Sequence, residues 1–194
     1  MPVNASNNQL DLLAQGFNLI SVDEQYYQLN DIVGKKGTVI AFICNHCPYV
    51  IKIIERFVFE AEQLEKIGVS TVTIMSNDVI SYPADSFENM KLFAKKYNFS
   101  FPHLFDENQN IAKAYNAVCT PDIFGFNKDK ILKYRGRLDS GISNSNKNIK
   151  RELFYAMELI TKKNNGPDKQ FNSFGCSIKW ISNEWINKKS NYNK

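Results

Sequence analysis

The stretch Cys44-Asn45-His46-Cys47-Pro48-Tyr49-Val50 places two cysteines three positions apart, where an apolar run ends and a helical pattern begins. A helix N-terminus offers unpaired backbone N–H groups and the positive end of the helix dipole, and both stabilise a thiolate relative to a thiol. The location of this pair therefore indicates a redox site.

The segments on either side of the cysteines predict a strand, a helix and a second strand. Residues 38–43 form a β-branched and aromatic run that suits a central strand. From Val50 to Ile67, apolar residues recur at the i, i+3, i+4, i+7 spacing of an amphipathic helix, and Gly68 is placed to end it. Residues 69–75 are the next buried strand, so the unit is a βαβ crossover, and chemistry in such sheets collects at the carboxyl ends of the strands.

The other segments are expected to complete a mixed sheet flanked by helices. Residues 17–20 and 26–29 predict a hairpin-like entry, and residues 123–126 and 131–134 predict a late antiparallel hairpin. A further helix is expected to begin near Pro83. The remaining expectations are a loose lead-in at residues 4–14, a loop or short strand at 101–106, a short helix at 108–115, a polar loop at 136–148, and a final amphipathic helix with apolar positions from Ile149 to Ile160.

Length and composition favour one domain. A chain of 194 residues with 43% hydrophobic content can bury one good core and is short for two. We expect a single domain over residues 1–194, with a core at about 17–163 and a C-terminal extension at 164–194. The extension carries apolar residues that predict it packs back on the domain, namely Phe171, Phe174, Cys176, Ile178, Trp180 and Trp185.

Charge and hydropathy predict neither a nucleic-acid nor a membrane partner. The net charge is +4, and much of the excess lies in Lys179, Lys188, Lys189 and Lys194, a pattern typical of a solvated end. No segment approaches the roughly 18 apolar residues that span a bilayer, and the first residues do not form a signal peptide. We therefore expect a cytoplasmic protein, in which a CxxC pair is more often catalytic or metal-binding than a structural disulfide.

Six blocks of the sequence resemble a group of thioredoxin-like proteins within the peroxiredoxin/redoxin superfamily (alkyl hydroperoxide reductase/thiol-specific antioxidant). The blocks are Phe42-Ile43-Cys44-Asn45-His46-Cys47-Pro48-Tyr49-Val50, Ser76-Asn77-Asp78, Tyr82-Pro83-Ala84-Asp85-Ser86, Cys119-Thr120-Pro121-Asp122, Tyr134-Arg135-Gly136-Arg137-Leu138-Asp139 and Gly175-Cys176-Ser177-Ile178-Lys179-Trp180. The resemblance implies an α/β, thioredoxin-like fold with a central mixed β-sheet flanked by helices, an N-terminal hairpin and a C-terminal extension.

The same resemblance implies a thiol-disulfide oxidoreductase. In it, Cys44 attacks a substrate disulfide and Cys47 resolves the mixed disulfide, with Cys44 facing a partner and Cys47 more buried in the first turn of the helix. Pro121 resembles the cis-proline that faces the CxxC, and Thr120 before it supplies backbone for pairing with an extended substrate. No cofactor and no metal are implied. The implied partners are protein or small-molecule disulfides and thiols and an unidentified thiol electron donor.

Three further residues, His46, Cys119 and Cys176, each allow two interpretations. His46 has the same position as the histidine in the CPHC site of the periplasmic oxidant family, where an imidazolium or N–H donor favours the thiolate and makes the pair more oxidising; the other reading is an exposed histidine without effect. Cys119, two residues before Pro121, is either a third redox thiol or a small buried hydrophobe, and Cys176 has the same two readings.

Two other activities compete with disulfide exchange. A peroxidase of the peroxiredoxin type carries Pro-x-x-x-Thr/Ser-x-x-Cys, but alignment on Cys47 puts Ile40 at the proline and Cys44 at the threonine. Arg135 and Arg137 are expected to form structural ion pairs with residues such as Asp139.

A non-enzymatic metal site is the second competitor. Four cysteines and two histidines are enough ligands, and Cys-x-x-Cys is half of many zinc sites, but Cys119 and Cys176 do not form a second close pair and His103 has no neighbouring ligand. The scattered acids Asp78, Asp85, Asp106 and Glu107 are interpreted as helix caps or solvated charges.

Overall fold

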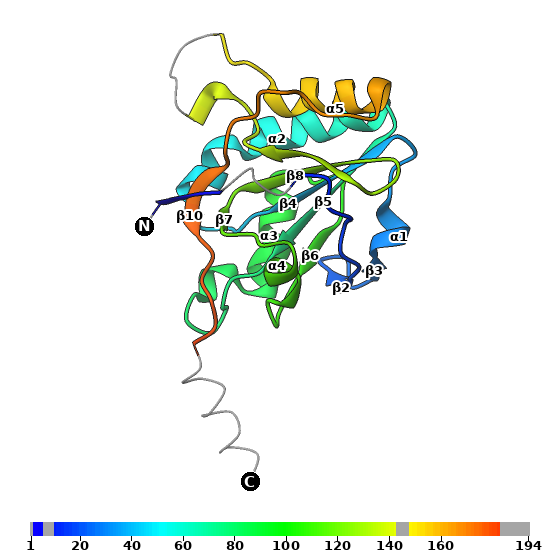
Figure 1. Cartoon of the computed structure of the whole chain (residues 1–194). Coiled ribbons are helices and arrows are strands. Elements are labelled where there is room, and N and C mark those ends of the chain that lie inside the picture. Colours follow the sequence, from blue (N-terminus) through cyan, green and yellow to red (C-terminus); the bar gives the residue numbers. More distant parts are fainter. Residues whose placement is uncertain (1, 6–9, 143–147, 183–194) are drawn as a thin grey trace.

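A computed structural model of the chain describes residues 2–5, 10–142 and 148–182. Within these residues the chain forms a seven-stranded mixed sheet with helices on both faces, and a separate three-stranded sheet (Figure 1). Lys188, Lys189, Lys194 and Trp185 lie outside the described residues.

The central strand of the large sheet leads directly to the cysteines. β4 (Gly37–Phe42) lies parallel to β5 (Val69–Met75) and antiparallel to β8 (Asp122–Asn127). The predicted βαβ unit and its central strand are therefore confirmed. The sheet order is β3-β2-β6-β5-β4-β8-β9, with β3 (Tyr26–Gln28) and β9 (Leu132–Gly136) at the edges and β2 (Asn18–Ser21) and β6 (His103–Phe105) inside. Both predicted hairpins are present.

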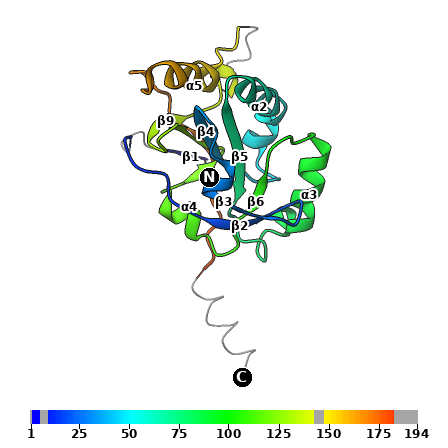
Figure 2. The same cartoon turned by 90° about the vertical axis from the view of Figure 1, so that its right-hand side faces the viewer.

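Side chains of β4 alternate between two hydrophobic cores, because successive residues of a strand point to opposite faces. Val39 and Ala41 belong to one core, and Ile40 and Phe42 to the other. The first core contains residues of α2 (Pro48–Lys66), α3 (Phe87–Lys96) and α5 (Glu152–Lys163), and the second contains residues of α1 (Leu29–Ile32) and α4 (Asn110–Ala114). Figure 2 shows α2 and α5 side by side over the sheet.

The helix boundaries follow local chemistry. Pro48 occupies the first position of α2, and Gly68, with φ of 85°, provides the left-handed residue after its end, as predicted. The helix expected near Pro83 begins later: Pro83–Asp85 is a 3₁₀ turn, and α3 begins at Phe87 because the Ser86 hydroxyl caps it by accepting the Asn89 N–H at 3.4 Å. Ile149 also precedes its helix, since α5 begins at Glu152.

The three-stranded sheet was not predicted. It joins β1 (Pro2–Asn4), β10 (Phe174–Ser177) and β7 (Cys119–Thr120), with β10 in the middle. The lead-in expected to be loose at residues 4–14 overlaps β1 only at Asn4, but Leu13 pairs with Ile131 in an antiparallel bridge, so its described part is not loose throughout. The prediction that the tail packs back is confirmed for its described part. The polar loop expected at 136–148 contains a 3₁₀ turn, Ser140–Ile142. Among the described residues, no helix is long and apolar enough to cross a membrane.

Candidate active site

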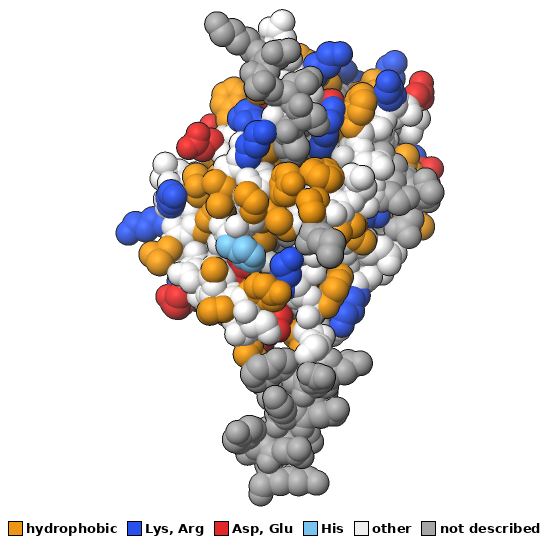
Figure 3. Space-filling model, turned by 90° about the vertical axis from the view of Figure 1, so that its left-hand side faces the viewer, with side chains coloured by type: hydrophobic (Ala, Val, Ile, Leu, Met, Phe, Trp, Pro, Cys, Tyr) orange, Lys and Arg blue, Asp and Glu red, His pale blue; other side chains and the backbone are white. Residues whose placement is uncertain are grey.

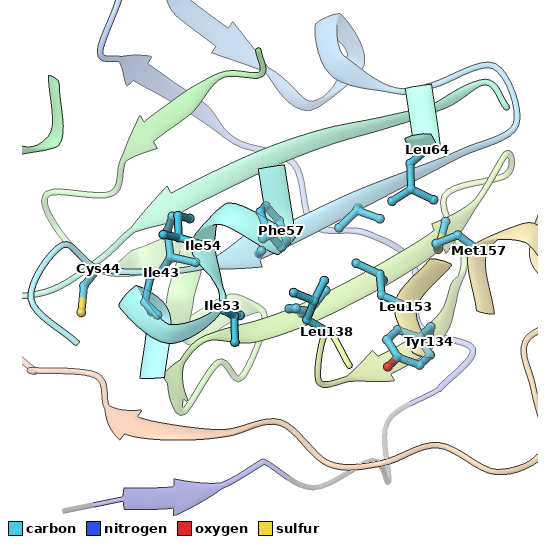
Figure 4. Packing of buried hydrophobic residues seen from close by; sticks show 14 of the residues in the cluster. Ile43, Cys44, Ile53, Ile54, Phe57, Leu64, Tyr134, Leu138, Leu153 and Met157 are labelled. Carbon is cyan, nitrogen blue, oxygen red and sulfur yellow. The ribbon is translucent and has the colours of Figure 1, made fainter. Parts of the chain in front are cut away.

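Both cysteines of the pair are buried in the loop between β4 and α2. Cys44 is 1% exposed and Cys47 is 0% exposed, and Figure 4 shows Cys44 at one end of the hydrophobic core. The expected exposure of Cys44 is therefore wrong, because Thr120 packs against the loop and its hydroxyl lies against the Cys44 sulfur. Cys47 is also not in the first helical turn: Pro48 starts the helix, so Cys47 is its N-cap residue.

The Thr120–Pro121 segment faces the cysteines, as the resemblance implied. Its peptide bond is cis. The Thr120 hydroxyl lies 3.3 Å from the Cys44 Sγ, and the Thr120 carbonyl accepts a hydrogen bond from the Cys47 thiol at 3.1 Å. One residue thus contacts both sulfurs.

The surroundings of Cys47 favour its thiolate. A hydrogen bond from the Cys44 thiol lowers the pKa of Cys47 to about 4, against the opposing effect of burial. The backbone N–H groups of Cys176 and Val50 and the Cys176 thiol add to this lowering. Val50 lies in the first turn of α2, so its N–H is one of the free N–H groups that a helix N-terminus presents.

The surroundings of Cys44 favour its thiol. The hydrogen bond to Cys47, then burial, then repulsion by the Asp85 carboxylate raise the pKa of Cys44 far above its ordinary value. The Thr120 hydroxyl opposes this effect. The hydrogen bond between the two sulfurs thus lowers the pKa of Cys47 and raises that of Cys44, and the N-terminus of α2 favours an anion at Cys47.

Asp85 is a buried anchor of the cysteine loop, which the sequence did not reveal. Its side chain is fully buried, accepts the Asn45 backbone N–H at 2.8 Å and the Asn77 side-chain amide at 2.7 Å, and lies 2.8 Å from His46 Nδ1. The interpretation of Asp85 as a cap or solvated charge is wrong, because these donors compensate for its burial.

The other acids behave largely as interpreted. Asp78 accepts the N–H groups of Ile80 and Ser81, and Asp106 accepts those of Ile111 and Ala112 in α4. Both are local caps.

His46 points its ring at Asp85. Its side chain is 33% exposed and its ring stacks on that of Tyr82, with centroids 6.0 Å apart. The two roles left open for His46 both remain predictions. The contact with Asp85 shows how the ring is held beside the cysteine loop.

We expect Asp85→Asn to make Cys44 more reactive. Removing the carboxylate removes a repulsion that raises the Cys44 pKa, so the thiolate population at a fixed pH rises about ten-fold for each unit of decrease. The measurement is alkylation of each cysteine followed by peptide mapping over a pH series. Asp129→Asn, an exposed residue in the turn before β9, is the control. An unchanged Cys44 profile in Asp85→Asn would contradict the assigned electrostatics.

The other two cysteines differ in their relation to the pair. Cys119 is buried in β7, and its thiol donates to the Pro121 carbonyl at 3.5 Å; burial raises its pKa. Cys176, half-buried in β10, is the one whose thiol and backbone N–H approach the Cys47 sulfur. Burial and the bond to Cys47 raise the Cys176 pKa to about 11.

The arginines form structural ion pairs, but with other partners than expected. Arg135 pairs with Asp122 at 2.9 Å, and Arg137 pairs with Glu152 at 2.6 Å. Asp139 instead binds Arg56 at 2.6 Å. The guanidinium of the buried Arg135 pairs with Asp122 and lies over the face of the Phe124 ring. This arrangement is typical of a structural role.

The metal-binding alternative receives little support from these positions. The Nδ1 of the fully buried His103 lies 2.8 Å from the Thr73 hydroxyl, and burial lowers the His103 pKa to about 3. Within the described residues, Cys44, His46 and Asp85 do bring possible ligand atoms within 4.8 Å of one another. Three ligand atoms at this distance come from the cysteine loop and Asp85, and neither Cys119, Cys176 nor His103 belongs to this group.

The face that carries β10 is rich in apolar side chains. Figure 3 shows hydrophobic side chains gathered around a partly exposed histidine on this side of the molecule. Exposed apolar residues near the site include Ile80, Tyr82 and Trp180. These apolar side chains lie on the surface of the molecule, whereas Cys44 and Cys47 are buried.

Comparisons with solved structures show close relatives. A conserved uncharacterized protein from Geobacillus kaustophilus is 40% identical with a TM-score of 0.89, over 93% of this chain and 97% of that one. A hypothetical protein from Sinorhizobium meliloti is 30% identical with a TM-score of 0.87, over 92% and 98%. No curated protein matches this chain.

More distant structures identify the fold. The thioredoxin domain of a thiol-disulfide oxidoreductase from Bacteroides vulgatus is 11% identical with a TM-score of 0.61, over 79% of this chain and 98% of that domain. This likeness confirms the thioredoxin-like fold class. The AhpC/TSA family profile matches residues 12–135, which carry the CxxC, Thr120-Pro121 and most of the central sheet. The chain belongs to the AhpC/TSA family.

Proposed function

We propose that this protein is a thiol-disulfide oxidoreductase that alternates between a Cys44/Cys47 dithiol and a Cys44–Cys47 disulfide. The observation that carries the proposal is the placement of both sulfurs against Thr120 at the start of α2: the Thr120 hydroxyl lies 3.3 Å from Cys44 Sγ, and the Thr120 carbonyl lies 3.1 Å from Cys47 Sγ. A dithiol of this kind holds a nucleophile and a second thiol within reach of one another. The substrates would be protein or small-molecule disulfides and thiols.

The reaction needs two exchanges. The Cys47 thiolate attacks one sulfur of a disulfide, forming a mixed disulfide and releasing a thiolate that takes the Cys44 proton. Cys44 then attacks Cys47 Sγ and displaces the second substrate thiolate, which takes a proton from water. The substrate disulfide is thereby reduced and the protein dithiol oxidised; the reverse sequence oxidises a dithiol.

This division of roles differs from the one implied by the family resemblance, in which Cys44 attacks. The low pKa of Cys47 and the raised pKa of Cys44 support Cys47 as the attacking thiolate. Short exposure of Cys44→Ser and Cys47→Ser to oxidised glutathione separates the two assignments. We expect faster capture of glutathione on Cys47 in Cys44→Ser than on Cys44 in Cys47→Ser, because the two sulfurs are equally buried and their pKa values are shifted in opposite directions.

We expect the pair to be a stronger oxidant than thioredoxin. Stabilising the Cys47 thiolate stabilises the reduced protein, so its reduction potential should lie well above about −270 mV, towards the roughly −120 mV of strongly oxidising pairs. Thiol trapping across a series of glutathione ratios measures the potential, and peptide mapping identifies the bridge. Absence of a Cys44–Cys47 disulfide at every ratio would refute the proposed function.

One observation favours peroxidase activity as a second candidate. Cys47 has the low pKa that a peroxide-attacking thiolate requires and occupies the peroxidatic position of the family pattern. Against it, the buried Arg135 is committed to Asp122. Stopped-flow mixing of the reduced protein with hydrogen peroxide or with oxidised glutathione discriminates between the candidates. Faster oxidation by peroxide would favour the peroxidase.

A further inference from the structure

The strand β10 occupies the edge at which an extended substrate would pair. β10 runs antiparallel to β7, and its register places Cys176 opposite Thr120, the residue before the cis-proline. The family resemblance assigned this Thr120 backbone to substrate binding. Here the chain's own segment fills that place, with a cysteine at the position next to the redox pair.

Contacts on both edges of β10 and at its two ends fix the position of the strand. β1 pairs with the other edge of β10, and Pro2 lies opposite Cys176. The Phe174 ring meets Tyr49 of α2 edge-on at 5.0 Å. After the strand, the Ile178 N–H donates to the Val118 carbonyl at 3.1 Å and the Lys179 N–H donates to Asn77 at 2.9 Å. The position of Cys176 is therefore a built feature of the fold.

The close approach of β10 to β7 depends on a residue without a side chain. A Cβ atom at Gly175 would lie 2.0 Å from the Thr120 carbonyl oxygen and 3.1 Å from Pro121. The backbone of β10 thus comes as near to the cysteine site as sterics allow. This approach brings the Cys176 thiol and N–H to the Cys47 sulfur.

We propose that Cys176 is the third redox thiol of the site, and that it exchanges with the Cys44–Cys47 disulfide to form a Cys47–Cys176 disulfide. The inference rests on the proposed function and extends it. Cys44 and Cys47 are buried, whereas Cys176 is half-buried, so the exchange moves the disulfide to a sulfur that solvent can reach.

The exchange balances without another oxidant. Cys176 loses its proton and attacks Cys47 Sγ, the Cys44–Cys47 bond breaks, and Cys44 takes up the proton. An external dithiol then supplies a thiolate that attacks Cys176 Sγ and expels Cys47 as a thiolate. The second thiol of that dithiol attacks the mixed disulfide and releases Cys176, so the dithiol is oxidised and the protein is reduced. Cys47 is the better leaving group of the new pair, because leaving thiols of lower pKa depart faster.

The first test compares two double variants that each keep Cys47 and one candidate partner. In Cys44→Ser/Cys119→Ser, oxidised glutathione should produce an internal Cys47–Cys176 disulfide, seen by peptide mapping. In Cys44→Ser/Cys176→Ser, we expect glutathione adducts without an internal bridge. Two results would overturn the assignment of Cys176. The first is that Cys44→Ser/Cys119→Ser forms glutathione adducts but no internal disulfide, and the second is that Cys44→Ser/Cys176→Ser forms a Cys47–Cys119 disulfide in equal yield.

The second test separates the role of Cys176 from the proposed function itself. Oxidised Cys176→Ser should still contain the Cys44–Cys47 disulfide, but its reduction by dithiothreitol should be at least about ten-fold slower than that of wild type, since burial limits access. Equal rates would refute the relay and leave the proposed function standing. A wild-type protein that never forms Cys44–Cys47 would refute the proposed function instead.

A third variant tests the pairing of β7 with β10 while keeping both thiols that form the bridge, Cys47 and Cys176. Gly175→Ala, added to Cys44→Ser/Cys119→Ser, should push β10 away from Thr120 and reduce the yield of the Cys47–Cys176 bridge several-fold. The circular dichroism spectrum reports whether the rest of the domain is folded. An unchanged yield in a folded variant would show that the β7–β10 pairing does not bring the two sulfurs together.

Discussion

Cys47→Ser is expected to remove the thiolate that the reduced wild-type protein keeps at neutral pH. The surroundings lower the pKa of Cys47 to about 4, while they raise that of Cys176 to about 11 and those of Cys44 and Cys119 further. Wild type should therefore show the ultraviolet absorbance of one thiolate at pH 7, lost with a midpoint near pH 4. Cys47→Ser should show no such transition.

The sign of this pH dependence follows from the lowered pKa. A thiol that is more acidic in the folded than in the unfolded state stabilises the reduced protein fully above the unfolded pKa, 9.0, and the contribution is lost as the pH falls through about 4. The reduced wild type should lose more stability on acidification over this window than reduced Cys47→Ser does. Urea denaturation under reducing conditions at several pH values measures the difference.

A matched pair at position 44 provides the control. The Cys44 thiol donates the bond that contributes most to the low pKa of Cys47. Serine retains a donor and alanine does not, so the absorbance midpoint should be higher in Cys44→Ala than in Cys44→Ser. Equal midpoints would contradict the assignment of the charge to Cys47.

The fold around this thiolate was largely predictable, because its determinants are local. Residues 38–43 and 69–75 are continuous apolar runs, and the helix between them has an apolar stripe that ends at a glycine. Binary pattern and end signals agree there, so the βαβ unit followed from the sequence. The cis-proline opposite the cysteines required the family resemblance in addition.

What escaped prediction depends on contacts between distant segments. β10 has four residues, including Gly175 and Ser177, and its partner edges lie at Cys119–Thr120 and Pro2–Asn4. Such a strand has no periodicity of its own. The burial of Cys44 was missed because Thr120, whose hydroxyl lies against its sulfur, is 76 residues away in the sequence. Asp85 was misread for the same reason, since only the fold brings Asn45 and Asn77 to its carboxylate.

The largest loss of stability is expected from Arg135→Met, because it leaves a buried carboxylate beside the cis-proline. The Arg135 and Asp122 side chains are 3% and 0% exposed. The guanidinium also donates to the Asn116 carbonyl at 2.7 Å and lies over the Phe124 ring at 4.6 Å. Removing one partner of such a pair costs about 3–5 kcal/mol, far more than the net value of the pair itself. Urea denaturation at pH 7 measures the loss.

The loss should shrink as the pH falls, which separates lost charge pairing from lost packing. Burial raises the Asp122 pKa even in the presence of Arg135, and without that cation the carboxyl should retain its proton to higher pH still. Below the pKa of Asp122 in the unfolded chain, 3.8, the carboxyl is protonated in both states, and the unpaired charge does not destabilise the folded protein. Above that pH, the destabilisation grows as the pH rises. A loss that is the same at pH 5 and pH 7 would assign the effect to packing.

Two further variants complete the comparison. Lys162→Met removes an exposed ion pair, in which the Lys162 and Glu158 side chains are 65% and 39% exposed. It should lower the free energy of unfolding by only about 0.3–0.5 kcal/mol. Adding Asp122→Asn to Arg135→Met removes the buried charge and should recover part of the stability at pH 7. If the double variant were no more stable than Arg135→Met, the unpaired charge could not be the main cost, and the contact of Arg135 with Phe124 would be the stronger explanation.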